Sequence, residues 1–247
     1  MSESLIVTRS GGCTTLTLNR PDRLNALDAG LVEALLATLA MASRDGTRIV
    51  VFRGAGKGFS GGFDFSGLAG YSDGDLVLRF VRLEQVLQSV WTAPFVTMAL
   101  AHGPCFGAAA DLVAACGIRV ASADAKFRMP GLRFGIALGT GRLARLVGTD
   151  AARQLLTTSR VFDADEAARI GFISKIAPPD EWDDLIGHAT ADAGVLPETA
   201  LARMLRLTRG ETGAAEMAEL VASISEPGLK ERIEAYIASI ARKSAGP

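Results

Sequence analysis

The chain has 247 residues, of which 49% are hydrophobic and 21% charged, and its formal net charge is -1. This composition is typical of a globular protein with one large domain, or with one domain and an appendage, and the lack of a basic block argues against nucleic-acid binding. Three irregularly spaced cysteines and two histidines argue against a disulfide framework and against a His/Cys metal site. The N-terminus lacks the pattern of a signal peptide and no apolar run reaches the ~18 residues of a membrane span, so we expect a reduced, cytoplasmic and soluble protein.

The first half of the chain predicts strands that alternate with helices. Two short strands are expected at 5–9 and 14–19, and the glycine pair between them is typical of a hairpin turn. Asp28 is a good N-cap for a helix that runs to about residue 42, because leucines recur on one face of it. The further expected elements are a buried strand at 48–54, a glycine-rich loop at 55–67, a helix at 75–91, a strand at 94–100, a turn at 102–107, a helix at 107–116 and a strand at 118–122.

The order of these elements indicates the fold class. Strand, glycine-rich turn, helix and strand follow one another twice, which predicts a mixed α/β core. From Gly139 onward helical patterns dominate, and the residues from 188 to the end are expected to be entirely helical. The segment 226–244 has the pattern of an amphipathic helix, which is compatible with subunit packing.

Two glycine-rich turns, GAGKGFSGG at 54–62 and HGPCFG at 102–107, each follow a predicted buried strand. Neither has the spacing of a Rossmann or Walker phosphate loop. Because small residues let a ligand approach the backbone, two N–H groups from two such turns can converge on one oxygen as an oxyanion hole. The second turn leads into a helix N-terminus, where free N–H groups favour negative charge, with Asp111 one turn deeper. The alternative is that the small residues at 107–110 only allow close helix packing.

Several segments, in their order along the chain, resemble the crotonase superfamily, the enoyl-CoA hydratase/isomerase fold. The family's early segment NRP-x-x-x-NAL is similar to NRPDRLNAL, and its strand and first oxyanion turn are similar to IVVFRGAGKGFSGGFDF. Its second strand, turn and helix are similar to APFVTMALAHGPCFGAAADLVAACGIRVASADAKF, and the helices that follow to RLARLVGTDAARQLLTTSRVFDADEAARIGFISKI. The resemblance covers residues 5–176 closely and the helical tail loosely.

This resemblance implies an α/β fold of the crotonase (ClpP-like) type, a spiral of ββα units with a helical C-terminal segment. We expect a spiral core at 1–187, which binds acyl-CoA and carries the active site, and a helical oligomerisation segment at 188–247. The resemblance also implies a homotrimer or hexamer. It implies a coenzyme A thioester of fatty acid metabolism as substrate. We expect no cofactor, no metal, no nucleic acid and no membrane as partner.

Candidate site residues follow from the matched motifs. The resemblance implies that the backbone N–H groups of Phe63 and Ala108 form the oxyanion hole and hold the thioester oxygen as it becomes enolate-like. Arg23, Leu24 and Ala26 match the stretch that embraces the nucleotide and pantetheine. Arg23 is then a phosphate contact, or else a solvated loop arginine. The other residues expected at the substrate and CoA site are Gly62, Asp64, Gly107 and Gly131.

The carboxylates depart from the family pattern. Family hydratases hold one water between two glutamates, and Asp111 stands at the first of these positions with a stem one methylene shorter, a difference to which catalytic geometry is sensitive. Gly131 stands at the second position, so that acid is missing. No acid stands at 138–140, where some family members carry one. Asp111 therefore remains the single acid/base candidate.

Four other side chains near these motifs are expected to be structural. Asp64 matches a widespread motif aspartate and is expected to brace the first turn. Glu84 is expected on a solvated helix face, and His102 is expected to brace the second turn. Cys105 is expected to be a small buried residue, because no histidine can be inferred beside it.

The sequence leaves three functions open. One carboxylate can move a proton within an enolate, which suits double-bond isomerisation of an acyl-CoA thioester by a lyase or isomerase. Hydration is the second function, with water held by Asp111 and a partner not yet assigned. The third is an inactive acyl-CoA-binding protein that keeps the thioester cradle and lacks the chemistry, as the glycine at 131 suggests. A dinucleotide oxidoreductase is not favoured, because the Rossmann spacing is missing.

Overall fold

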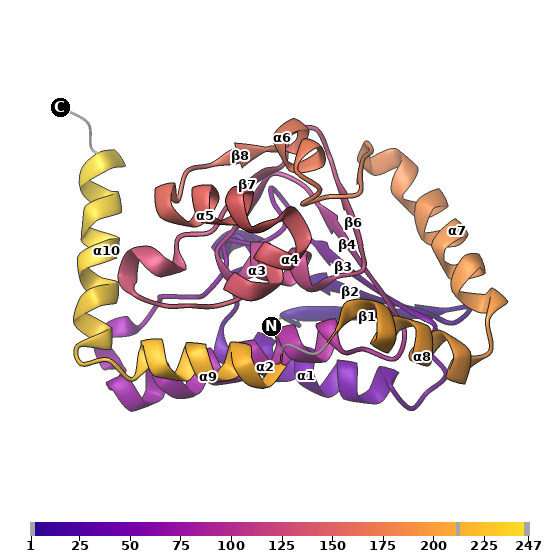
Figure 1. Cartoon of the computed structure of the whole chain (residues 1–247), viewed down its shortest axis with the longest axis horizontal. Coiled ribbons are helices and arrows are strands. Elements are labelled where there is room, and N and C mark those ends of the chain that lie inside the picture. Colours follow the sequence, from indigo (N-terminus) through magenta and orange to yellow (C-terminus); the bar gives the residue numbers. More distant parts are fainter. Residues whose placement is uncertain (1–2, 211–212, 245–247) are drawn as a thin grey trace.

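A twisted, mixed sheet forms the centre of the chain in the computed structural model, which describes residues 3–210 and 213–244 (Figure 1). The strand order is β1-β2-β3-β4-β6-β9, with β1 antiparallel to β2 and every later neighbour parallel. These strands are β1 Leu5–Ser10, β2 Cys13–Leu18, β3 Ile49–Gly54, β4 Val96–Ala101, β6 Ile118–Ala121 and β9 Lys175–Ile176. A second, three-stranded sheet has the order β5-β7-β8, formed by Pro104–Phe106, Lys126–Arg128 and Phe162–Asp163.

Helices cover both faces of the large sheet and extend beyond it (Figure 1). They are α1 Ala29–Ala42, α2 Asp73–Trp91, α3 Ala108–Ala115, α4 Thr140–Val147, α5 Thr149–Thr158, α6 Ala164–Arg169, α7 Trp182–Val195, α8 Glu198–Arg209, α9 Gly213–Ile224 and α10 Leu229–Ser244. Figure 1 shows α9 running beside α2 and α10 standing at the end of the molecule opposite α7. None of the described helices is long and apolar enough to cross a membrane.

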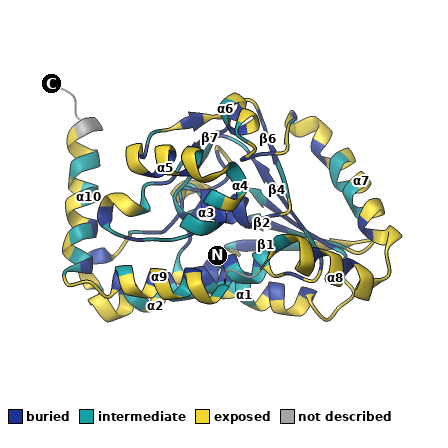
Figure 2. Cartoon of the chain, in the orientation of Figure 1, coloured by how far each residue is buried: buried dark blue, intermediate teal, exposed yellow. Residues whose placement is uncertain are grey.

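The alternation of side chains along β3 explains the two cores. Val50 and Phe52 face α1, α2 and α3, whereas Ile49 and Val51 face Trp182 at the start of α7. Successive side chains of a strand point to opposite faces, so a strand covered on both sides reads as a continuous apolar run. All eight residues of α3 are buried, and Figure 2 shows this helix in dark blue at the middle of the molecule.

The expected α/β class and most expected elements are confirmed. Asp28 caps α1 by accepting a hydrogen bond from the N–H of Leu31 at 2.8 Å. The helix expected at 75–91 begins two residues earlier, because Ser72 and Asp75 form a capping box. The segment expected as a simple turn at 102–107 contains the short strand β5, which pairs with β7. The domain boundary expected at residue 187 stays a prediction, and α7 runs across it.

Candidate functional site

The two glycine-rich turns lie against each other at the carboxyl ends of β3 and β4, which are parallel neighbours in the sheet. Ser60 and Cys105 form a parallel bridge between the turns, and the N–H of Phe106 donates to the carbonyl of Ser60 at 3.0 Å. His102 lies 2.9 Å from the carbonyl oxygen of Gly56 through Nε2, so it braces the turns as expected. Sheet topology therefore brings together two segments that are separate in sequence.

Glycine is required where the turns touch most closely. Gly62 has a φ of +87°, and a Cβ there would lie 2.3 Å from the carbonyl oxygen of Phe106 and 3.2 Å from the nitrogen of Ala108. Gly107, with a φ of +54°, also occupies the left-handed region that favours glycine. The backbone around Phe63 and the backbone at Ala108 are consequently close neighbours, as the matched motifs led us to expect.

The N–H groups of Phe63 and Ala108 are free to bind a ligand. The Gly62 carbonyl accepts from the Leu27 N–H, and the Asp64 N–H donates to the Leu27 carbonyl. Along the chain, the Phe63 N–H lies between these two hydrogen bonds. Ala108 is the first residue of α3, whose N–H has no acceptor within its own helix. Among the described residues, neither N–H has a hydrogen-bond acceptor. Two free backbone donors from adjacent turns can hold one oxygen.

A buried asparagine holds the segment 19–27 against the first turn through hydrogen bonds. Asn25 donates from Nδ2 to the carbonyls of Ala55 and Gly58, at 2.7 and 3.0 Å, and accepts from the N–H of Arg20 at 2.8 Å. Arg20 in turn forms an ion pair with Asp64 at 2.7 Å. Sequence reasoning missed both Asn25 and Arg20, although NRPDRLNAL contains them.

Asp64 braces the turn rather than lining a cavity. Its carboxylate accepts from the Ser66 N–H at 2.8 Å and pairs with Arg20. Burial alone would raise the pKa of this carboxyl, but the hydrogen bonds from Ser66 and Arg20 outweigh it and lower the pKa. Asp64 therefore stays ionised and fixes the turn that carries Phe63.

Arg23, Leu24 and Ala26 belong to the segment that is hydrogen-bonded to the first turn. Arg23 ends a short 3-10 turn and is exposed, so it is accessible to an anionic ligand. The Leu24 carbonyl accepts from the N–H of Gly61 at 2.7 Å. The Ala26 carbonyl accepts from the Arg20 guanidinium.

A cavity of about 290 Å³ opens beside the two free N–H groups. It is lined by Phe63 and Ala108 together with Asp111, and by largely apolar side chains of the segment 128–138. Tyr236 of α10 closes one side, with its ring 4.6 Å from that of Phe134. Sequence reasoning missed this wall, because α10 carries no local pattern that links it to residue 134. The cavity is a largely apolar space with one carboxylate, two backbone donors and the polar side chains of Arg128, Thr140 and Tyr236.

Asp111 is the carboxylate of this cavity. It is 5% exposed, and its Oδ1 has no hydrogen-bond partner among the described residues. Burial raises the pKa of Asp111 well above its usual value. The guanidinium of Arg142 acts against that rise, whereas Glu84 and Glu216 add to it. A desolvated carboxyl with a raised pKa is suited to take up a proton from a bound ligand and to return it.

Behind Asp111 lies a buried ion pair that sequence reasoning missed. Arg142 of α4 donates to both carboxylate oxygens of Glu84 in α2, at 2.9 and 2.5 Å, and both side chains are 1% exposed. The expectation that Glu84 lies on a solvated helix face is therefore wrong. Charged groups are rarely buried without such a partner, and the partner here is 58 residues away.

Gly131 lies on the wall of the same cavity, in a 3-10 turn at Gly131–Phe134. A Cβ at this position would lie 2.8 Å from the carbonyl oxygen of Ile136. The Ile136 N–H donates to the Gly131 carbonyl at 2.9 Å, so the turn is held closed at this point. The position thus lacks both an acid and the room for any side chain.

Cys105 in this region has structural surroundings. Cys105 is fully buried, and burial raises the pKa of its thiol well above its usual value, which leaves it unreactive. Among the described residues, no three His, Cys, Asp or Glu side chains gather closely enough to bind a metal ion.

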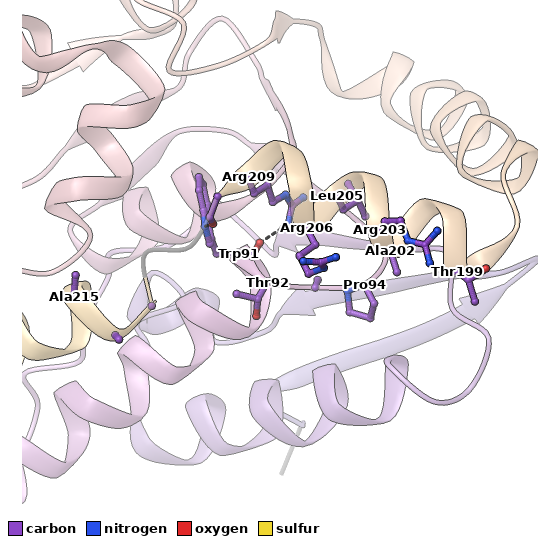
Figure 3. A pocket seen from close by; sticks show the side chains of 14 residues that line it. Trp91, Thr92, Pro94, Thr199, Ala202, Arg203, Leu205, Arg206, Arg209 and Ala215 are labelled. Atoms are coloured by element: carbon purple, nitrogen blue, oxygen red, sulfur yellow. Dashed lines mark hydrogen bonds between the residues drawn. The ribbon is translucent and has the colours of Figure 1, made fainter.

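A larger groove of about 880 Å³ lies elsewhere, between the end of α2 and helix α8 (Figure 3). Arg209 in its wall donates to the carbonyls of Val90 and Trp91 at 2.9 and 2.8 Å. A cation at the end of α2 stabilises the carbonyl groups there. The described lining residues include no carboxylate, so we place the candidate site in the smaller cavity.

The chain is similar to known proteins over most of its length. Residues 8–191 match the family model described as enoyl-CoA hydratase/isomerase. A crystal structure from Bordetella parapertussis, described as an enoyl-CoA hydratase/isomerase, superimposes with a TM-score of 0.95 at 46% identity, covering 96% of this chain and 99% of that one. A Rhizobium meliloti protein described as an enoyl-CoA hydratase is 31% identical over 96% of this chain and 95% of its own length. A Mycobacterium leprae protein of the same description is 34% identical over 69% of this chain and 70% of its own length.

Proposed function

The chain belongs to the enoyl-CoA hydratase/isomerase family, and from that premise we propose that it is an enzyme that acts on acyl-CoA thioesters through an enolate, with Asp111 as its acid/base group. One observation carries the proposal. Asp111 has an unpartnered, buried carboxylate oxygen in the same cavity as the free N–H groups of Phe63 and Ala108.

The two N–H groups would hold the thioester oxygen. When a proton leaves the carbon beside the thioester, negative charge moves onto this oxygen, and fixed donors stabilise that charge without reorganising. The Ala108 N–H belongs to the first turn of α3, where the helix dipole favours the same charge. Because both donors are backbone groups, the Phe and Ala side chains do not interfere.

Asp111 would remove a proton from the thioester and return it. With one carboxylate, the same group can take a proton from one carbon and deliver it to another, which is the shift of a double bond. Hydration needs in addition a group that holds water. Both reactions pass through the same enolate, so the proposal covers a lyase or an isomerase that requires no cofactor.

The remaining functional assignments follow the family. Arg23 is exposed beside the first turn and would contact a phosphate of coenzyme A, with Leu24 and Ala26 along the nucleotide and pantetheine. We propose a homotrimer or hexamer assembled through the C-terminal helices. A place in cytoplasmic fatty acid metabolism is part of the same proposal.

A panel of saturated, 2-enoyl and 3-enoyl CoA thioesters tests the proposed function. We expect turnover of at least one enoyl thioester, followed by mass spectrometry and chromatography. A gain of one water indicates hydration, and a new isomer of unchanged mass indicates a double-bond shift. Binding of every thioester without any product would contradict the proposal and support the second candidate, a non-catalytic acyl-CoA-binding protein, which the closed turn at Gly131 favours.

Placing an acid at position 131 should not create a two-carboxylate site. Because a Cβ there meets the Ile136 carbonyl oxygen at 2.8 Å, we expect Gly131→Glu to lower the free energy of unfolding by about 1–3 kcal/mol, in the range of overpacked positions. Urea unfolding measures this loss, and hydration of a 2-enoyl-CoA should not rise.

The matched control for this change is Leu132→Glu, at the neighbouring position, whose side chain is 42% exposed. It adds the same charge without the backbone contact and should leave the free energy of unfolding nearly unchanged. Equal stability of the two variants, or faster hydration by Gly131→Glu, would show that position 131 does have room for a working acid.

A further inference from the structure

Two buried polar atoms of the cavity lack a partner. Asp111 Oδ1 and Thr140 Oγ1 both have no hydrogen-bond partner among the described residues, and both residues line the cavity of about 290 Å³. Buried polar atoms are nearly always paired with protein or with ordered water, so each exception calls for a reason. The simplest explanation for two such atoms in one cavity is a ligand that forms a hydrogen bond with both.

Gly139 makes room for the carboxyl group of Asp111 beside Thr140. Gly139 has a φ of +65° and directly precedes Thr140, the first residue of α4. A Cβ at Gly139 would lie 2.2 Å from Asp111 Oδ1, so the carboxyl group lies against a position without a side chain. The hydroxyl and the carboxyl therefore approach the same part of the cavity with nothing from residue 139 between them.

The chemistry of the two groups fits one oxygen ligand. A hydroxyl both donates and accepts hydrogen bonds, and an ionised carboxylate only accepts them. A water molecule needs two to four polar partners in such a space, and it can donate to Asp111 while Thr140 fixes its direction. The remaining lining is largely apolar, with Phe63 and Phe80 among it, and its other polar side chains are Arg128 and Tyr236.

We propose that Thr140 is the positioning residue for a water molecule that adds to carbon 3 of a 2-enoyl thioester. This inference rests on the proposed function and selects hydration within it. The water oxygen forms a bond to carbon 3 as one water proton passes to Asp111. The electrons of the C2=C3 double bond move through carbon 2 to the thioester oxygen, which the Phe63 and Ala108 N–H groups hold. Asp111 then returns the proton to carbon 2, so one water is added in total and no oxidant is needed.

This assignment explains how hydration proceeds without an acid at position 131. Thr140 does not serve as a base, because a hydroxyl keeps its proton at ordinary pH, and Asp111 carries every proton transfer. A double-bond shift, by contrast, needs only a carboxylate and makes no use of a second polar group.

Thr140→Val tests the proposal, with Thr140→Ser as the conservative variant. Valine keeps the shape of threonine and removes a hydroxyl that makes no hydrogen bond within the described residues. We expect Thr140→Val to lower kcat for hydration by about tenfold, in line with the loss of one hydrogen bond, and Thr140→Ser to recover most of the rate. The Kd of a saturated acyl-CoA and the thermal unfolding midpoint should stay close to wild type.

The outcomes separate this inference from the proposed function. Undiminished hydration by Thr140→Val overturns the role of Thr140 and leaves the function of Asp111 standing. Wild-type protein that only shifts double bonds also overturns it and leaves the enolate chemistry intact. Absence of any product from wild-type protein overturns both.

Discussion

Asp111→Asn should lower kcat on the productive enoyl thioester by about 10²–10⁴-fold, which is the usual contribution of a positioned acid/base group. The amide has nearly the size and shape of the carboxyl group, so it still fits against Gly139, but it can neither take nor return a proton. Steady-state rates on the substrate found with the thioester panel measure the effect. Binding of a saturated acyl-CoA should be retained, because the Phe63 and Ala108 N–H groups are unchanged.

The pH dependence of the wild-type rate should come from the same group. Burial, with a further contribution from Glu84 and Glu216, raises the pKa of Asp111 above its usual value of 3.8 despite the opposing Arg142. Since only the ionised form accepts a proton, kcat/KM should rise with pH across a range well above 3.8. The residual rate of Asp111→Asn should lack this rise.

The stability of Asp111→Asn provides a control, because the substitution should raise the free energy of unfolding while it lowers the rate. A carboxyl group whose pKa is higher in the folded than in the unfolded protein binds protons more tightly when folded. Its contribution to stability is complete below the unfolded pKa and is lost as pH rises through the folded one. Asp111→Asn removes this loss, so the variant should unfold at higher urea than wild type at neutral pH. A variant that keeps full turnover would contradict the role of Asp111.

Long elements with clear signals were predictable from the sequence, whereas short ones were not. The cap at Asp28 and the leucine repeat after it define α1, because both signals are local. The strand β5 has three residues, too few to show a period, and it forms because β7 pairs with it. Strand pairing over such a distance is a tertiary effect that local pattern does not contain.

The residues of the candidate site also divide into those that the sequence predicted and those that it did not. Phe63, Ala108 and Asp111 stand in motifs whose order along the chain indicates a common cavity, and the described geometry brings all three to it. Glu84 was misjudged because a single acid in a helix looks solvated until its partner Arg142 is seen. Thr140 gives no signal in the sequence, since its importance lies in an unpartnered hydroxyl beside a glycine.

Breaking the buried pair of Glu84 and Arg142 should have the largest effect on stability. We expect Glu84→Met and Arg142→Met each to lower the free energy of unfolding by about 3–5 kcal/mol, because each leaves one buried charge without its partner. The double variant should lose much less than the sum of the two, since it leaves neither charge. Urea unfolding at neutral pH measures all three.

The same helix offers a matched control. Arg82 of α2 pairs with Glu33 of α1, but these side chains are 37% and 52% exposed. Glu33→Met should therefore change the unfolding midpoint only slightly, because exposed pairs contribute little. A loss in Glu84→Met no larger than in Glu33→Met would show that the buried pair contributes no more than a surface pair.

Glu84→Met and Arg142→Met should also shift the pH dependence of kcat/KM in opposite directions. Burial sets the raised pKa of Asp111, while the positive charge of Arg142 lowers it and the negative charge of Glu84 raises it further. Arg142→Met should move the rise of kcat/KM to higher pH, and Glu84→Met should move it to lower pH. A purely structural role for the pair would reduce the rate of both variants without separating their pH profiles. Opposite shifts would therefore show that the pair adjusts the proton affinity that burial gives Asp111.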